Sequence, residues 1–160
     1  MTSPRSIDRP DIHETYGIER GAEGLLGWEW AASRLEASRN YWVATTRPDG
    51  SPHVMPVWGV FADGRVCFGT APESVKATNL GADPRVVVHV ESGDEAVVVE
   101  GRAVPVDDTT LLQEIRAGFI HKYGVDVVGD GDGHFLAVEP IVAFAWLESD
   151  YPATATRFRF

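Results

Sequence analysis

The stretch YWVATTRPDGSPHVMPVWGVFADGRVCFGT, residues 41–70, decides the expected fold. Its side chains follow a period of two, and Asp-Gly pairs at 49–50 and 63–64 interrupt the pattern. Asp-Gly tolerates the positive backbone dihedral angles that tight hairpin turns require. The stretch therefore predicts three consecutive strands, ending with RVCFGT, that form an antiparallel meander.

More strands follow along the chain. Residues 85–92 and 95–106 are rich in β-branched residues, and the second run is long enough to bend at Gly101. Residues 135–149 predict a sixth strand, in which Pro140 would suit an edge position or a bulge. The tail TATRFRF alternates once more, so we expect six or seven antiparallel strands.

Three helices are expected around these strands. Helical spacing of apolar residues predicts an amphipathic helix over 25–39 and another over 107–123. A shorter helix over 74–84 has Ser74 as its expected N-cap and Pro84 at its end.

Residues 1–24 mix Pro, Gly and charge without periodicity, and predict an irregular N-terminal arm. Residues 25–160 are expected to form a single domain, because a chain of 160 residues with 44% hydrophobic residues fills one core better than two. Residues 124–134 predict a loop. Without any βαβ rhythm, the expected fold class is mainly β with peripheral helices (α+β), a small closed or partly closed antiparallel barrel.

The formal net charge of -10 disfavours nucleic acid and anionic membranes as partners, so an anionic ligand would need a local basic pocket. The single cysteine, Cys67, allows no intrachain disulfide and is expected to be a small buried hydrophobe. No run of residues has the length and apolarity of a membrane span or a signal peptide, and we expect a soluble, cytoplasmic protein. The five histidines show no metal-ligand spacing, and we expect no metal.

One motif indicates a candidate phosphate-binding site. Thr70, Ser74 and Lys76 form a T-x-x-x-S-x-K pattern where the third strand meets the short helix. Helix N-terminal amides, a hydroxyl and one cation together hold a phosphate well. The alternative from spacing alone is equally open: Ser74 is only a cap, and Lys76 is only a solvated charge.

This motif and its flanks resemble the pyridoxamine 5'-phosphate oxidase-like family of FMN-binding split β-barrel proteins. The resemblance covers residues 25–160 and includes the order of the T-x-x-x-S-x-K helix, the DPR strand at 83–85 and the VEG strand at 99–101. Within the family, the chain looks most similar to the actinobacterial flavin/deazaflavin oxidoreductases. The resemblance implies a homodimer with a flavin-type cofactor at the subunit interface.

Two departures from the family pattern argue against oxidation of pyridoxamine phosphate. The family's Ser-Arg-Lys triplet is here Ser74, Val75 and Lys76, which removes a bidentate phosphate contact. The basic residues at the two ends of the preceding strand motif are replaced here by His53 and Trp58.

Further cofactor contacts are expected elsewhere. Val57, Trp58 and Gly59 would line the cofactor ring, although the same pattern fits a plain barrel core. Arg157 shares a strand face with Arg159, and either fringes an edge strand or meets an anionic cofactor across the interface. The cofactor's anionic tail has three more candidate partners, between which spacing does not choose: Arg47, Arg65 and Arg85.

The sequence hypothesis is an oxidoreductase that uses the deazaflavin coenzyme F420, with FMN as the alternative cofactor, to reduce a small unsaturated or quinone-like substrate. No catalytic side chain is assigned, because hydride transfer belongs to the cofactor. The rivals are a module that binds flavin or haem without turnover, and a barrel that serves only as a dimer scaffold.

Overall fold

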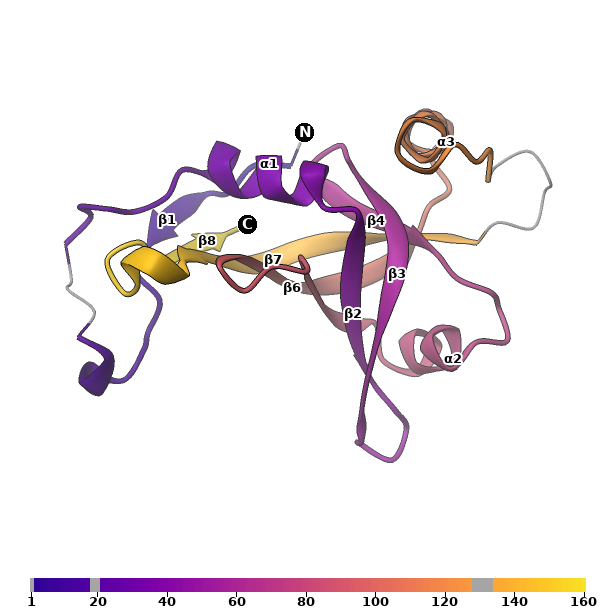
Figure 1. Ribbon diagram of the computed structural model, residues 1–160. Helices are drawn as coiled ribbons and strands as arrows, with labels where there is room; N and C mark the ends of the chain where they lie inside the picture. Colours follow the sequence, from indigo (N-terminus) through magenta and orange to yellow (C-terminus); the bar gives the residue numbers. More distant parts are fainter. Residues whose placement is uncertain (1, 18–20, 128–133) are drawn as a thin grey trace.

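The computed structural model describes residues 2–17, 21–127 and 134–160, and shows a twisted β-barrel with helices around it (Figure 1). The strands of the described residues are β1 (Ser6–Asp8), β2 (Asn40–Thr46), β3 (Pro52–Ala62), β4 (Arg65–Gly69), β5 (Arg85–His89), β6 (Glu95–Pro105), β7 (Phe135–Leu147) and β8 (Thr156–Arg159). The helices are α1 (Trp28–Ala37), α2 (Val75–Ala82) and α3 (Thr109–Tyr123), with short 3-10 turns at Glu14–Tyr16 and Glu148–Asp150.

Strand β7 closes the barrel because it is paired along both edges. Along one edge, β7 pairs with β6 from Leu136 to Leu147. The other edge pairs first with β4 and then, further along, with β8. The circuit β7–β4–β3–β2–β5–β6–β7 is a closed six-stranded antiparallel barrel, as the sequence predicts, and β8 and β1 extend the sheet beyond it.

A bulge lies in the middle of β7. Gly101 of β6 pairs with Pro140, whereas the preceding Glu100 pairs with Val142, so Ile141 is the extra residue. Pro140 also lies between the last β4 pairing, at Ala137, and the first β8 pairing, at Val142. The predicted bend at Gly101 and the predicted bulge at Pro140 are therefore confirmed, while the edge position is not what the structure shows.

Two hydrophobic clusters hold the barrel together. The first fills its interior and continues under α1, where Trp28 packs edge-on against Phe158 at 5.2 Å between ring centroids. The second lies between the outside of the barrel and α3, and contains Ile115, Phe119 and Cys67. Cys67 is fully buried, as predicted, and burial raises the pKa of its thiol to about 12, so it is an inert core residue.

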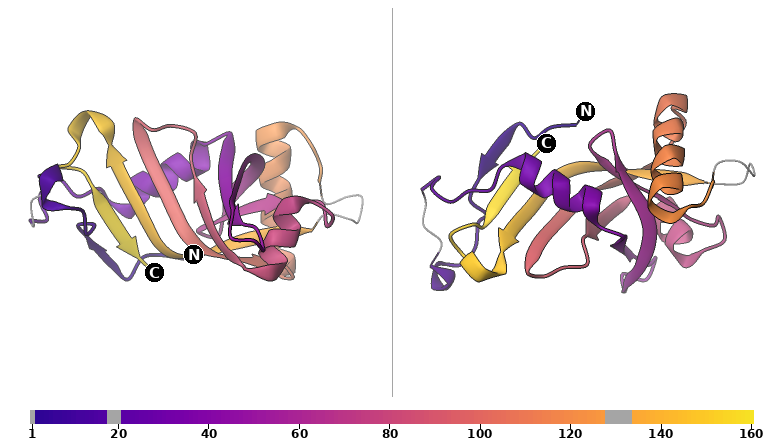
Figure 2. Two further views of the ribbon diagram at one scale, coloured as in Figure 1. Left: turned by 90° about the horizontal axis from the view of Figure 1, so that it is seen from below. Right: turned by 45° about the horizontal axis from the view of Figure 1, so that its top comes forward.

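One outer face of the sheet carries no helix in front of β6, β7 and β8 (Figure 2, left view). Paired residues form rows across this face. One row is Trp42, His89, Val98, Phe144 and Arg157, and the next is Ala44, Val87, Glu100, Val142 and Arg159. The face is thus largely apolar, but the exposed Glu100 lies between Val87 and Val142 in the second row, and Arg157 and Arg159 lie at the ends of the rows.

The N-terminal arm is more regular than the sequence indicates. Strand β1 pairs antiparallel with β8, and Arg157 of β8 binds the carboxylates of Asp8 and Asp11 at 2.7 and 2.5 Å. Arg9 donates to the carbonyl of Ala155 at 3.0 Å. The prediction of an irregular arm missed β1, because three residues show no periodicity and their partner strand lies at the other end of the chain.

Other sequence expectations concern the ends of helices. α1 is shorter than the predicted 25–39, since Leu26 precedes it and donates its N–H to Thr156 Oγ1 at 2.8 Å. Gly124 ends α3 in the left-handed conformation, with φ of 71°. The predicted loop that follows it lies partly outside the described residues, at 128–133.

No described helix has the length and apolarity needed to cross a lipid bilayer.

Gly59 is expected to tolerate no larger residue. A Cβ atom there would lie 2.7 Å from the carbonyl oxygen of Cys67 on the paired strand. Gly59→Ala should lower the free energy of unfolding by about 1 to 3 kcal/mol through overpacking. Gly81 of α2 is the control, because its Cβ would meet no atom within 4 Å, and Gly81→Ala should raise stability by about 0.5 to 1 kcal/mol. Urea unfolding measures both, and equal effects would contradict this packing.

Candidate functional site

The two hydroxyls of the motif meet at the N-terminus of α2. Thr70 Oγ1 lies 2.8 Å from Ser74 Oγ, and Ser74 Oγ accepts a hydrogen bond from the backbone N–H of Ala77 at 3.1 Å. Ser74 is therefore the N-cap, as predicted. Thr70 is held in turn, because its N–H donates to the carbonyl of His134 at 3.1 Å. The remaining amides of the first helical turn have no partner within the helix, as at any helix start.

Lys76 lies in the first turn of α2 and is half-buried. Burial lowers the pKa of its ammonium, and no opposing charge contributes to this shift. Within the described part of the chain, no hydrogen-bond acceptor or carboxylate is paired with it. Lys76 is therefore not the fully solvated charge of the alternative interpretation. A partly desolvated cation next to helix amides and two hydroxyls has the composition of an anion site.

A buried polar contact fixes α2 against the barrel. Asn79 is 1% exposed and donates from Nδ2 to Thr45 Oγ1 on β2 at 2.9 Å. Leu80 beside it enters the barrel core. The helix N-terminus is thus held in place by the barrel wall. Sequence reasoning missed Asn79. Its position on the apolar side of a short helix could have indicated a buried amide with a polar partner.

Trp58 forms an exposed aromatic platform on β3. Its indole stacks in parallel on Tyr123 of α3, with centroids 4.5 Å apart and planes 8° apart, yet Trp58 remains 48% exposed. Since Tyr123 covers one face of the indole, the opposite face is accessible to a planar group. Val54 and Met55 on the same strand are 49% and 50% exposed. This part of β3 therefore offers apolar surface that the described chain does not cover.

Val57 and Gly59 occupy other environments. Val57 is half-buried and packs against the interior cluster. Gly59 is buried, its N–H donates to the Tyr123 hydroxyl at 2.9 Å, and its carbonyl accepts from Lys122 Nζ at 3.0 Å. Gly59 consequently has no spare amide for a ring edge, and its contribution is to let β3 and β4 approach. The assignment of these residues as ring-lining stays a prediction.

Lys122 is the second half-buried lysine, and it is fully bonded. Its ammonium donates to the carbonyls of Ser38 and Gly59 and lies 3.4 Å from the Tyr41 hydroxyl. It therefore joins the end of α3 to β3 and to the end of α1. Local sequence could not indicate these bonds, because the Ser38 and Gly59 carbonyls are distant from Lys122 in sequence.

Lys122 predicts a specific pH dependence of stability. Burial lowers the pKa of its ammonium from 10.5 to about 8. Between these values the unfolded chain binds more protons than the folded chain, so this group makes stability rise with pH. The destabilisation caused by Lys122→Met should therefore grow as the pH is raised from 7.5 to 10. Urea titrations of both proteins at each pH measure the difference, and a difference that shrinks over this range would contradict the assignment.

The structure does not bring Arg157 to the α2 N-terminus within one chain. Arg157 pairs with Phe144 of β7, nine residues from Phe135, which pairs with Gly69 just before Thr70. At 3.3 Å per residue this separation is roughly 30 Å. Arg157 is 12% exposed in its side chain and ion-paired with the arm. A contact of Arg157 with a cofactor across an interface stays a prediction.

The other three arginines each have a local partner. Arg47 donates to the carbonyl of Pro52 at 2.6 Å, Arg65 pairs with Asp63 at 2.8 Å, and Arg85 pairs with Asp83 at 2.5 Å. Their positions therefore favour none of the three as a contact for the anionic tail of a cofactor. Across the described ranges, His, Cys, Asp and Glu side chains form no group of three or more that could hold a metal ion.

The comparisons with known proteins agree with this architecture. The fold is a split β-barrel. The model of the family described as "Pyridoxamine 5'-phosphate oxidase" matches residues 29–147, and the chain belongs to this family. The family binds flavin-type cofactors and includes oxidoreductases. No curated protein matches the chain.

Three solved structures show the same fold. The conserved hypothetical protein Rv2991 from Mycobacterium tuberculosis has a TM-score of 0.68 and 24% identity, over 81% of this chain and 89% of that one. A protein described as an F420 reductase has a TM-score of 0.57 and 24% identity, over 69% and 93%. A heme binding protein from Mycobacterium smegmatis has a TM-score of 0.64 and 17% identity, over 79% and 56%.

Proposed function

We propose that this protein is a homodimeric oxidoreductase that binds coenzyme F420 and reduces a small unsaturated or quinone-like substrate. The observation that carries the proposal is the half-buried Lys76, which pairs with no other described residue and lies in the first turn of the helix that Ser74 caps, where Ser74 also bonds to Thr70. An F420 reductase among the structures of the same fold supports F420, and FMN is the alternative cofactor.

The residues present fit the anionic part of such a cofactor. Ser74 Oγ already accepts from Ala77, so its own proton, or that of Thr70, is free to be donated to a phosphate oxygen. Lys76 would supply the positive charge, and the first-turn amides of α2 would add further donors. Val75 in place of the family's arginine leaves a smaller set of phosphate contacts.

The ring part of the cofactor would lie along β3. The exposed face of Trp58 offers stacking area, and Tyr123, stacked on the other face, keeps the indole fixed. The bound cofactor supplies hydride transfer; the chain's contribution is to align the ring, exclude water from one side of it and hold its phosphate.

A second copy of the chain would complete this site. The outer sheet face exposes an apolar patch next to β3, and we define the dimer patch as Trp42, Ala44, Val54, Val87, Val98, Ile141 and Val142. A groove of about 420 Å³ lies partly within it, lined by apolar residues such as Ala44, Val87 and Ile141 and also by the charged residues Arg85 and Glu100. Exposed apolar patches of this kind mark association surfaces. A two-fold pairing on this patch would place a second wall beside Trp58.

Lys76→Ala should weaken the affinity for F420 by about 1.5 to 3 kcal/mol, the range for a charge-assisted hydrogen bond. Fluorescence titration of the cofactor measures the dissociation constant. Arg116→Ala is the matched control, because it also removes one positive charge but lies on α3, paired with Asp126. An unchanged dissociation constant in Lys76→Ala, with the protein folded, would refute the phosphate assignment.

Val87→Glu in the dimer patch should convert a dimer to a monomer, because two buried carboxylates would face each other across the two-fold axis. Sedimentation velocity measures the mass. Ile120→Glu is the control, since Ile120 is an exposed apolar residue of α3 outside the patch. A dimer that survives Val87→Glu, or a monomeric parent protein, would contradict the proposed interface.

Turnover separates the proposal from its rivals. The purified protein is first titrated with F420, FMN and haem, and the tightest complex is identified by its spectrum. Reduced F420 is then followed at its absorbance maximum with a panel of quinones and activated alkenes. Substrate-dependent oxidation supports the reductase. Binding without oxidation across the panel would support the non-catalytic module, and no binding of any cofactor would support the scaffold.

A further inference from the structure

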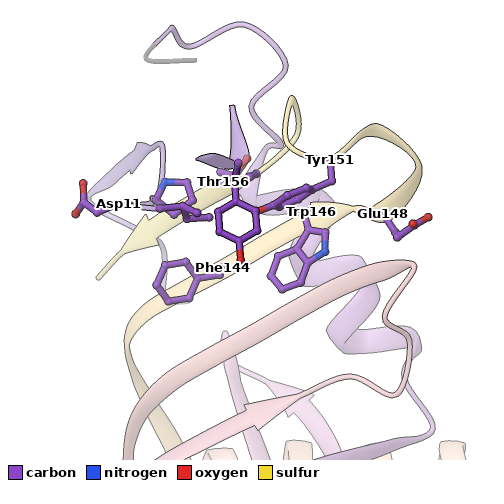
Figure 3. A pocket seen from close by; sticks show the side chains of 10 residues that line it. Asp11, Phe144, Trp146, Glu148, Tyr151 and Thr156 are labelled. Carbon is purple, nitrogen blue, oxygen red and sulfur yellow. The ribbon is translucent and has the colours of Figure 1, made fainter. Parts of the chain in front are cut away.

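A cavity of about 700 Å³ lies where the N-terminal arm crosses the outer face of β7 and β8 (Figure 3). Four aromatic side chains from three separate segments line it. Tyr16 belongs to the arm, Phe144 and Trp146 to β7, and Tyr151 to the connection before β8. The volume lies within the range of small-molecule sites.

Polar contacts hold this cavity open on the arm side. Arg157 binds Asp8 and Asp11 together, and Arg9 donates to the carbonyls of Ala153 and Ala155 in the segment before β8. The arm is thus tied to the sheet at Asp8, Arg9 and Asp11, just before Ile12 and Tyr16 of the cavity wall. Trp146 and Tyr151 meet edge-on at 6.3 Å, so the rings support each other.

The electrostatics of the cavity favour a cation. Asp11 and Glu148 lie at its rim, and no lysine, arginine or histidine lines it. Both carboxylates point away from the rings, so this negative charge surrounds the cavity and is not part of its wall (Figure 3). In Figure 3 these two residues stand at opposite sides of the group of rings. Asp11 is paired with Arg157, whereas the Glu148 carboxylate has no hydrogen bond or ion pair within the part of the chain that the structure describes. Aromatic faces carry negative potential and attract cations, and the chain's net charge of -10 adds to this field.

Tyr16 and Tyr151 also remain unusually accessible. Tyr16 is 59% exposed and Tyr151 is also among the exposed large hydrophobic residues, although both line a concave surface. Apolar area that folding leaves exposed in a cavity becomes available to a ligand.

We propose that this cavity is a binding site for a flat aromatic organic cation. The site is separate from the Lys76 region, since Trp146 lies eleven residues along β7 from Phe135, roughly 35 Å at 3.3 Å per residue. The two proposed sites also differ in charge, because Lys76 has no partner among the described residues, whereas the cavity has aromatic walls with Asp11 and Glu148 at its rim. The inference does not depend on the proposed function.

The test compares the N-methylquinolinium cation with quinoline, a ring system of the same shape that is uncharged at pH 8. Calorimetry gives both affinities, and the indole N–H signals of ¹⁵N-labelled protein report the location, with Trp146→Phe assigning the Trp146 signal. We expect the cation to bind at least about fivefold more tightly than quinoline, and to shift the Trp146 signal while leaving the Trp58 signal in place. Equal affinities, no binding, or a shift confined to other indoles would overturn the proposal.

Matched variants test the two parts of the recognition. Tyr16→Ala should lower the cation's affinity about fivefold, whereas Tyr16→Phe, which keeps the ring, should leave it unchanged. Glu148→Gln should lower the affinity for the cation about threefold and leave that for quinoline unaltered. Glu114→Gln removes the same charge from the exposed side of α3 and should change neither. If Tyr16→Ala binds the cation like the parent protein, the aromatic site is refuted.

Discussion

The pairing of β7 along both of its edges is the constraint on which the rest of the structure depends. β7 receives β6 along one edge, and β4 and β8 in succession along the other. The change of partner occurs at the bulge, where Pro140 provides no N–H and Ile141 is the extra residue. This arrangement closes six strands into a barrel, and it leaves β8 free to anchor the arm.

The closed barrel determines what the polar residues can do. The last residue of β4, Gly69, pairs with the first residue of β7, so the chain leaves the barrel at Thr70. α2 starts a few residues later, and the hydroxyls of Thr70 and Ser74 and the residue Lys76 therefore lie at or near one helix N-terminus. Because Asn79 bonds to β2, that helix end is held against the barrel wall. Lys122, in contrast, uses its charge to join elements of the fold. The two lysines differ in their partners: Lys122 is bonded to carbonyls of the fold, whereas Lys76 pairs with no other described residue, and for this reason we propose only Lys76 as a binding group.

Local sequence predicts the elements well, because alternation, Asp-Gly turns and the Ser74 cap act over a few residues. The pairing partners depend on contacts between distant segments. This is why β1 was missed, and why the sequence could not choose between an edge position and a bulge for Pro140. At the candidate site, the contact of Thr70 with Ser74 follows from their spacing. The stack of Trp58 on Tyr123 joins residues 65 positions apart, so no local pattern could have indicated it.

The central claim is that the N-terminus of α2 holds the phosphate of a flavin-type cofactor. The most direct measurement follows the backbone amide signals of ¹⁵N-labelled protein during titration with F420 and, separately, with FMN. The account predicts that the largest shifts fall on the amides of Val75 and Lys76, with the Trp58 indole signal also moving. Shifts that leave these residues unchanged and gather elsewhere on the barrel would contradict it.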